Sequence, residues 1–311
     1  MFEDEGSPVS FLHPIPAIIL IMIGVTLGFV LVGPLIGILA SLPFYNGGIL
    51  ELAKALETPL QSEGIKIPIY ILQGFATLVG LIITPIILLR AFKKSAFAFF
   101  HDQKFYPITL LITPLIVVSF MGINSFFVQW NADVHFPEFL RAFENWAREK
   151  EDYAARLTEY MTDFASIPEL ITALFVIAVL PAIGEELVFR GLIQNELNRL
   201  TRNIHAAIWL SAVLFSAFHL QFFGFVPRML LGALFGYLYY WSGNLSMSML
   251  AHFTNNAVAV LSLYYYQGGD LEYNVEGTEA FPLSVVLTSG LITFLLLYYY
   301  WNFYQNRSSL P

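Results

Sequence analysis

Cysteine is absent from the 311 residues, and charged residues make up only 12% of them. Without cysteine the chain can form no disulfide, no thiolate metal site and no cysteine nucleophile. Soluble domains carry roughly 25% charged residues, so this chain cannot cover a water-facing surface in the usual way. The net charge of −8 argues against nucleic acid as a partner, because phosphate binding requires a basic surface.

Hydrophobic residues, at 57%, take the place of the missing charges. A transmembrane helix needs about 20 apolar residues. The first apolar stretch follows a segment without Lys or Arg, and it is longer than a signal-peptide core, so it is interpreted as a retained membrane helix. We therefore predict an all-α, multi-pass transmembrane bundle of about eight helices, at residues 14–42, 68–92, 106–130, 167–198, 204–223, 225–242, 244–266 and 281–304.

Lysine and arginine gather in alternate connections of this bundle. Cytoplasmic loops carry an excess of these two residues, so the pattern predicts that both termini lie in the cytoplasm. The residues concerned are Arg90, Lys93, Lys94 and Lys104 at the second connection, Arg199 and Arg202 at the fourth, and Arg307 near the end.

Residues 133–164 differ from the rest, since apolar side chains recur there at helical spacing among eight acids and four bases. This pattern predicts an amphipathic helix or helix pair outside the membrane, at the interface or capping the bundle. Two roles remain open for it: a solvated connector with one apolar face, or an element that gates substrate entry.

The stretch "LPAIGEELVFRGLI" places charges inside a predicted span. A charge at the bilayer centre costs about 2.5 to 3.5 kcal/mol on insertion scales, so it persists only with a partner or a function. Glu186 and Arg190 stand at i, i+4 on one helix face, which predicts an ion pair. Glu185 is turned about 100° away, toward a possible cavity. We therefore predict that Glu185 is the chemically available acid, whereas Glu186 and Arg190 are mainly structural.

Two histidines are predicted to lie mid-helix: His219 in "LFSAFHL" and His252 in "LAHFTNN". At about 1.5 Å per residue, Glu185 and His219 lie about 21 Å from the cytoplasmic edge, and His252 and Asn256 about 14 and 20 Å. All four therefore fall in one middle slab of the membrane. The alternative is that each residue only fixes helix packing. The remaining histidines, at span ends or in loops, are interpreted as incidental: His13, His101, His135 and His205.

A carboxylate and two imidazoles around one water could deprotonate it and later return the proton to a leaving amine. Asn256 or a protonated histidine could donate to the developing oxyanion. This chemistry is peptide-bond hydrolysis within the membrane. Glu185, His219 and His252 are also suitable ligands for Zn²⁺, with water as the fourth, so metal-dependent and metal-free mechanisms both remain open.

Other proteolytic chemistries fit less well. The sequence contains no HExxH zinc motif and no G-x-S-G serine. The "GGD" ending at Asp270 lies in an acidic loop without a partner aspartate in the membrane, which argues against an aspartyl dyad.

"EELVFR", "FSAFH" and "HFTNN" occur in this order on separate predicted helices. They resemble the E-E-x-x-x-R, F-x-x-x-H and H-x-x-x-N motifs of the CAAX-processing and bacteriocin-processing (CPBP) intramembrane proteases, the Ras-converting-enzyme or Abi family. The stretch between the two histidines is similar as well, with Gly232 and Gly236 expected at a small-residue helix contact.

The resemblance implies endopeptidase activity on membrane-associated peptides or proteins, of the CAAX type or the bacteriocin-leader type, in a bacterial cell membrane. It implies that Glu185 and His219 activate water and that His252 and Asn256 support the oxyanion. Supporting motif residues would be Glu186, Arg190 and Phe215.

The chain is expected to form one integral domain in three parts. Residues 1–165 hold N-terminal spans and the amphipathic segment, residues 166–266 the core that carries the motifs, and residues 267–311 an acidic loop and the last span. The competing function is a non-catalytic immunity or secretion-partner protein that binds a peptide in the same cavity. A transporter is disfavoured because the sequence shows no repeated half.

Overall fold

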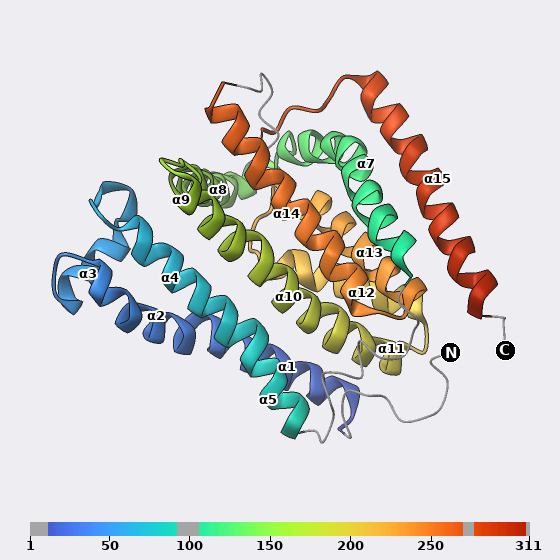
Figure 1. The fold of residues 1–311 in the computed structure, drawn as a ribbon, viewed down its shortest axis with the longest axis horizontal. Coiled ribbons are helices and arrows are strands. Elements are labelled where there is room, and N and C mark those ends of the chain that lie inside the picture. The colour runs from blue at the N-terminus through green and yellow to red at the C-terminus, as the bar shows by residue number, and fades with distance from the viewer. Residues whose placement is uncertain (1–11, 92–105, 270–276, 309–311) are drawn as a thin grey trace.

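The computed structural model describes residues 12–91, 106–269 and 277–308 (Figure 1). Its described part consists of helices joined by turns and short connections, and contains no strand. The predicted all-α class is confirmed. Several residues singled out above lie outside the described residues, namely Lys93, Lys94, His101, Lys104 and Asp270.

Five helices in the described part are long and apolar enough to cross a membrane, which makes the chain an integral, multi-pass membrane protein. Three more of the eight predicted spans are helices in the expected places: α12 (Ile204–Phe218), α13 (Phe225–Ser242) and α14 (Leu245–Gln267). The first of these is apolar but short, so the count of eight stays a prediction for these three. The five long helices are Pro14–Phe44, Lys66–Ala91, α7 (Pro107–Ala132), Ile167–Thr201 and Leu283–Asn306 of α15 (Leu283–Ser308).

Three of the long helices contain π-helical turns, in which the backbone hydrogen bonds span one residue more than in an α-helix. Such turns are frequent at functional sites. One of them, Leu187–Gln194, begins directly after Glu186. The others separate α1 (Pro14–Leu27) from α2 (Gly33–Ser41), α4 (Lys66–Thr77) from α5 (Thr84–Ala91), and α9 (Ile167–Ala173) from α10 (Leu180–Glu186), which leads on to α11 (Asn195–Thr201).

The helix Ile167–Thr201 runs through the middle of the bundle (Figure 1). Within its most apolar stretch 44% of the residues are buried inside the protein, against 17% to 33% in the other long helices. It packs against α1, α4 and the turn Leu78–Ile83 on one side, and against α12 and α14 on the other. Charged side chains on this helix can therefore be shielded from lipid by protein.

Helices α12 and α13 pack closely through the small residues predicted for this contact. A Cβ atom added to Gly236 would lie 2.9 Å from Ile208 Cγ2 on α12 and 2.8 Å from Gln194 Oε1. At Gly232 it would lie 3.2 Å from the Ala212 Cα atom. The predicted contact of Gly232 and Gly236 is confirmed.

Gly236→Ala is expected to destabilise the protein by about 1 to 3 kcal/mol, because the new methyl group overpacks this contact. Thermal unfolding in detergent measures the change. The matched control is Gly74→Ala in α4, where an added Cβ would meet its nearest atoms at 3.8 Å, an ordinary contact. Equal unfolding midpoints for the two variants would contradict the prediction.

The amphipathic segment forms one helix, α8 (Arg141–Met161), after a short turn at Glu138–Leu140. Its C-terminal end is attached to α4, where the Tyr70 hydroxyl donates to the Met161 carbonyl. Close to its start, Glu144 is buried and ion-paired with Arg148 at 3.0 Å. His135, interpreted as incidental, lies 2.9 Å from Glu144 through Nδ1, although its side chain is 80% exposed.

The Glu144 carboxylate titrates outside the membrane spans. A hydrogen bond from the Phe136 N–H, followed by bonds from His135 and Arg148, lowers its pKa from 4.5 to about 2. Because the folded pKa is lowered, the stabilisation is present above the unfolded pKa and is lost as the pH falls from about 4.5 toward 2. Unfolding midpoints measured from about pH 5 down to about pH 2, the window in which this stabilisation is lost, should therefore fall more steeply in the wild type than in Glu144→Gln. Parallel curves would contradict this assignment.

Candidate active site

The ion pair predicted from the i, i+4 spacing is present in the centre of the bundle. Arg190 Nη1 donates to Glu186 Oε1 at 2.8 Å, and the two side chains are 1% and 0% exposed. Arg190 Nη2 donates to the Gly232 carbonyl at 2.7 Å, and the guanidinium carbon lies 4.6 Å from the centre of the Phe215 ring. The buried cation is thus held by a carboxylate, a carbonyl and an aromatic face.

Glu186 has a second partner that the sequence did not indicate. Its Oε1 lies 2.8 Å from His252 Nδ1, on a helix 66 residues further along the chain. A neutral imidazole makes this bond with its proton on Nδ1, which leaves the lone pair of Nε2 free to accept. Glu186 therefore orients His252 as well as neutralising Arg190.

The prediction that His219 lies mid-helix is wrong. The residue forms the C-terminal cap of α12. The helix ends there because Leu220 adopts a left-handed conformation, with φ at 54°. His219 Nδ1 lies 2.8 Å from the Phe215 carbonyl, to which it donates. As in His252, this bond leaves Nε2 available as an acceptor.

The two free Nε2 atoms face one carboxylate oxygen. Glu185 Oε2 lies 3.8 Å from His219 Nε2 and 3.9 Å from His252 Nε2. The oxygen is buried and accepts no hydrogen bond from any described residue. These separations exceed a hydrogen bond, and they are short enough for one water to bridge the groups. The structure thus brings together three residues that the sequence placed at one depth.

Aromatic rings fix the two imidazoles. Phe215, the first residue of "FSAFH", lies edge-on to His219 and His252, with centroid distances of 5.0 and 6.0 Å. Phe235 of α13 stacks on His252 at 5.2 Å and was not indicated by the sequence. A single large aromatic residue in a sequence is normally assigned to the hydrophobic core, so the contact of Phe235 with His252 could not be recognised from the sequence.

Asn256 follows His252 by one turn of α14. Its Nδ2 donates to the Ile177 carbonyl at 3.1 Å, within the π-helical turn Leu174–Val179. Its Oδ1 accepts from Asn255 Nδ2 at 3.2 Å. An amide nitrogen carries two N–H donors, so one remains for a further acceptor.

The arrangement does not by itself define a metal site. Among the described residues, no group of three or more His, Asp or Glu side chains is arranged to hold one. Zn²⁺ requires ligands at about 2.0 to 2.2 Å from a common centre.

Residues 167–258 match the family described as type II CAAX prenyl endopeptidase Rce1-like. The match covers less than a third of the chain. The matched residues include all three motifs that carry the resemblance to the CPBP proteases. The site geometry thus belongs to the Rce1-like part of the chain.

One curated relative is an uncharacterised protein, YpbD, of Bacillus subtilis (strain 168). It is 32% identical over 97 residues, which cover 30% of this chain and 44% of the relative. The chain therefore spans less than half of that relative's length. No solved structure matches the chain.

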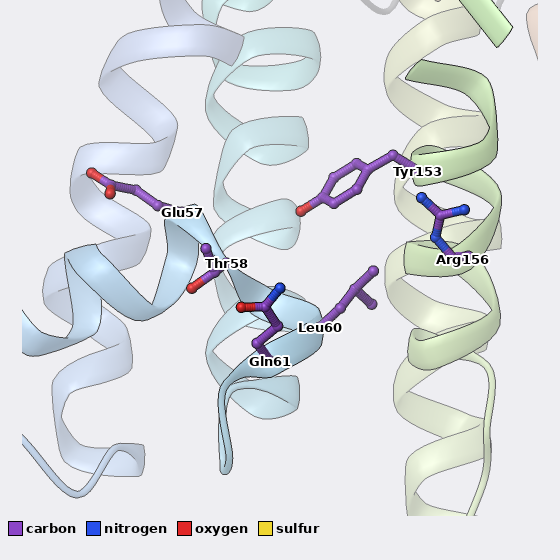
Figure 2. A pocket seen from close by; sticks show the side chains of 6 residues that line it. All are labelled: Glu57, Thr58, Leu60, Gln61, Tyr153 and Arg156. Atoms are coloured by element: carbon purple, nitrogen blue, oxygen red, sulfur yellow. The ribbon is translucent and has the colours of Figure 1, made fainter. Parts of the chain in front are cut away.

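A pocket of about 230 Å³ lies between the turn Pro59–Gln61, which follows α3 (Ile49–Glu57), and helix α8 (Figure 2). Its lining residues lie outside the range that matches the Rce1-like family. None of the candidate site residues contributes to the pocket. The pocket is lined by Glu57, Thr58, Leu60, Gln61, Tyr153 and Arg156.

Proposed function

We propose that the protein is an intramembrane endopeptidase that hydrolyses peptide bonds of membrane-associated substrates with a water activated by Glu185. The observation that carries this proposal is the approach of two imidazole Nε2 atoms to Glu185 Oε2, at 3.8 and 3.9 Å. This oxygen accepts no hydrogen bond from the described residues. The Rce1-like match supports protease activity at the level of the family.

In the proposed reaction, Glu185 takes a proton from a water molecule between it and the two imidazoles. The water oxygen attacks the carbonyl carbon, and the carbonyl electron pair moves to oxygen. The free N–H of Asn256 donates to this oxyanion. The C–N bond then breaks as Glu185 returns the proton to the leaving nitrogen. The products are a carboxylic acid and an amine, and the acid proton then passes to the amine to give a carboxylate and an ammonium ion.

His219 and His252 contribute orientation. Each is held in one tautomer through Nδ1, by the Phe215 carbonyl and by Glu186. Water has two O–H groups, so Glu185 accepts one and the Nε2 lone pair of one histidine accepts the other, which directs an oxygen lone pair toward the substrate. Holding the water in the attacking geometry lowers the entropic part of the activation barrier.

The proposed substrates are peptides that reach the site from the membrane, either prenylated CAAX-type C termini or hydrophobic leader segments. Comparing the new protein termini in cells that express the wild type or Glu185→Gln tests the proposal and identifies the substrate. Purified protein with an internally quenched farnesylated CAAX peptide tests one class directly. If Glu185→Gln still complements a deletion phenotype, the non-catalytic immunity or secretion role is favoured instead.

The proposed topology places both termini in the cytoplasm. This orientation puts the connection after α12 and the whole of α8 on the opposite side of the membrane. Reporter fusions at the two termini and within α8 test it: a reporter that is active only in the cytoplasm should respond at both termini and stay silent in α8.

A further inference from the structure

His219 lies where its own helix ends: α12 holds its ring through the Phe215 carbonyl, but no further helical turn follows to fix its backbone. It lies at the C-terminal cap of α12, and its neighbour Leu220 has a positive φ of 54°. The connection 219–224 that follows is a turn between α12 and α13. The placement of the His219 ring therefore depends on the contacts that hold this connection as well as on the Phe215 carbonyl.

The end of α7 holds the connection from one side. Asn131 Nδ2 donates to the Phe222 carbonyl at 3.1 Å, and Asn131 Oδ1 accepts from the Val226 N–H at 2.8 Å. Asn131 is buried, so both bonds are shielded from water. One side chain thus joins the connection to the first turn of α13.

Helix α8 holds the same connection from outside the bundle. Glu151 Oε1 accepts the Phe222 N–H at 2.7 Å and the Phe223 N–H at 3.1 Å. The guanidinium carbon of Arg148 lies 3.8 Å from the centre of the Phe223 ring. Hydrogen bonds to an ionised carboxylate are about twice as strong as neutral ones, so this attachment is firm.

Arg148 is itself fixed to the segment between α7 and α8. Its Nη2 donates to the Val134 carbonyl at 2.8 Å and its Nε to Glu144 Oε1 at 3.0 Å. Glu144 in turn accepts the Phe136 N–H at 2.8 Å. The helix that presents Glu151 is therefore anchored at the same end of the bundle as the connection it contacts.

We propose that Asn131 and Glu151 are positioning residues that clamp the connection 219–224, so that His219 Nε2 faces Glu185. The inference rests on the proposed function, and it assigns a role to residues outside the Rce1-like match, which begins at residue 167. Under this proposal α8 helps to position His219, so it is more than a passive connector.

The clamp is tested first without any substrate. In protein labelled with ¹⁵N-histidine, the ring signals of His219 and His252 are assigned with His219→Gln and His252→Gln. Glu151→Ala is expected to shift or broaden the His219 signals and to leave those of His252 in place. The matched control is Glu149→Ala, an exposed position on the same helix, which should change neither. Unchanged His219 signals in Glu151→Ala would overturn the clamp.

Turnover of the quenched farnesylated peptide tests the consequence. Glu151→Ala and Asn131→Ala should each lower kcat by about 10²-fold with little change in KM, because a small displacement of a reacting group has this effect. The kcat of Glu151→Gln should lie between those of the wild type and Glu151→Ala, since the amide oxygen still accepts both N–H groups. This variant replaces Glu151→Ala in the assay if the alanine variant fails to fold. Wild-type kcat in Glu151→Ala would overturn the proposal. Activity retained by Glu185→Gln would instead refute the proposed function, and the histidine signals would still decide whether the clamp exists.

Discussion

Glu185→Gln is expected to lower kcat by about 10² to 10⁴-fold, the range that general acid–base catalysis contributes. The amide has nearly the shape of the carboxylate but cannot take a proton from water. The Oε2 atom makes no hydrogen bond with any described residue, so its replacement breaks none of the contacts that hold the fold. Single-turnover cleavage by purified protein measures the change.

The effect on stability separates chemistry from folding in this variant. The unfolding midpoint of Glu185→Gln should match that of the wild type, because the Glu186–Arg190 pair and the bond from Glu186 to His252 are untouched. Glu149→Gln, at an exposed position of α8, is the matched exchange away from the site. Cleavage by Glu185→Gln at the rate of Glu149→Gln would remove Glu185 from the mechanism.

Arg190→Ala is expected to destabilise the protein by about 3 to 5 kcal/mol, the usual result of removing one partner of a buried ion pair. The variant leaves the Glu186 carboxylate buried with His252 as its only remaining hydrogen-bond partner among the described residues. It also removes the hydrogen bond to the Gly232 carbonyl, which joins the helix Ile167–Thr201 to α13. Thermal unfolding in detergent or lipid measures the loss.

A surface pair provides the comparison for Arg190→Ala. Arg141 and Glu138 also form an ion pair, with side chains 67% and 75% exposed. Arg141→Ala should cost at most about 1 kcal/mol. The double variant Arg190→Met with Glu186→Gln should recover much of the loss, because no unpaired charge is left in the interior. Equal effects of Arg190→Ala and Arg141→Ala would show that the buried pair contributes no more than an exposed one.

The sequence predicted those parts of the site that local geometry determines. The Glu186–Arg190 pair follows from the spacing within one helix, and the close contact of Gly232 and Gly236 follows from their small size. The common depth of Glu185, His219 and His252 was predicted by counting residues from the membrane edge. The rise per residue of a helix is constant, so the count needs no knowledge of the neighbouring helices.

Contacts between distant residues could not be predicted in the same way. The bond between Glu186 and His252 depends on the rotation of α14 about its axis, which apolar residues on all sides of a membrane helix do not specify. The end of α12 at Phe218 was missed because "FHLQFF" contains neither Gly nor Pro, and the break depends on the left-handed Leu220. The contacts of Asn131 and Glu151 join segments that are 71 to 95 residues apart.

The pairing of Arg190 with Glu186 also determines how charge moves during the reaction. With both imidazoles neutral, the two carboxylates and the guanidinium carry one net negative charge, formally located on Glu185. When Glu185 takes a proton from water, that charge passes to the hydroxide, and when the hydroxide attacks, it passes to the oxyanion. At each stage these groups carry one net negative charge, so the reaction moves an existing charge and never separates a new pair of charges in a medium where separation is expensive.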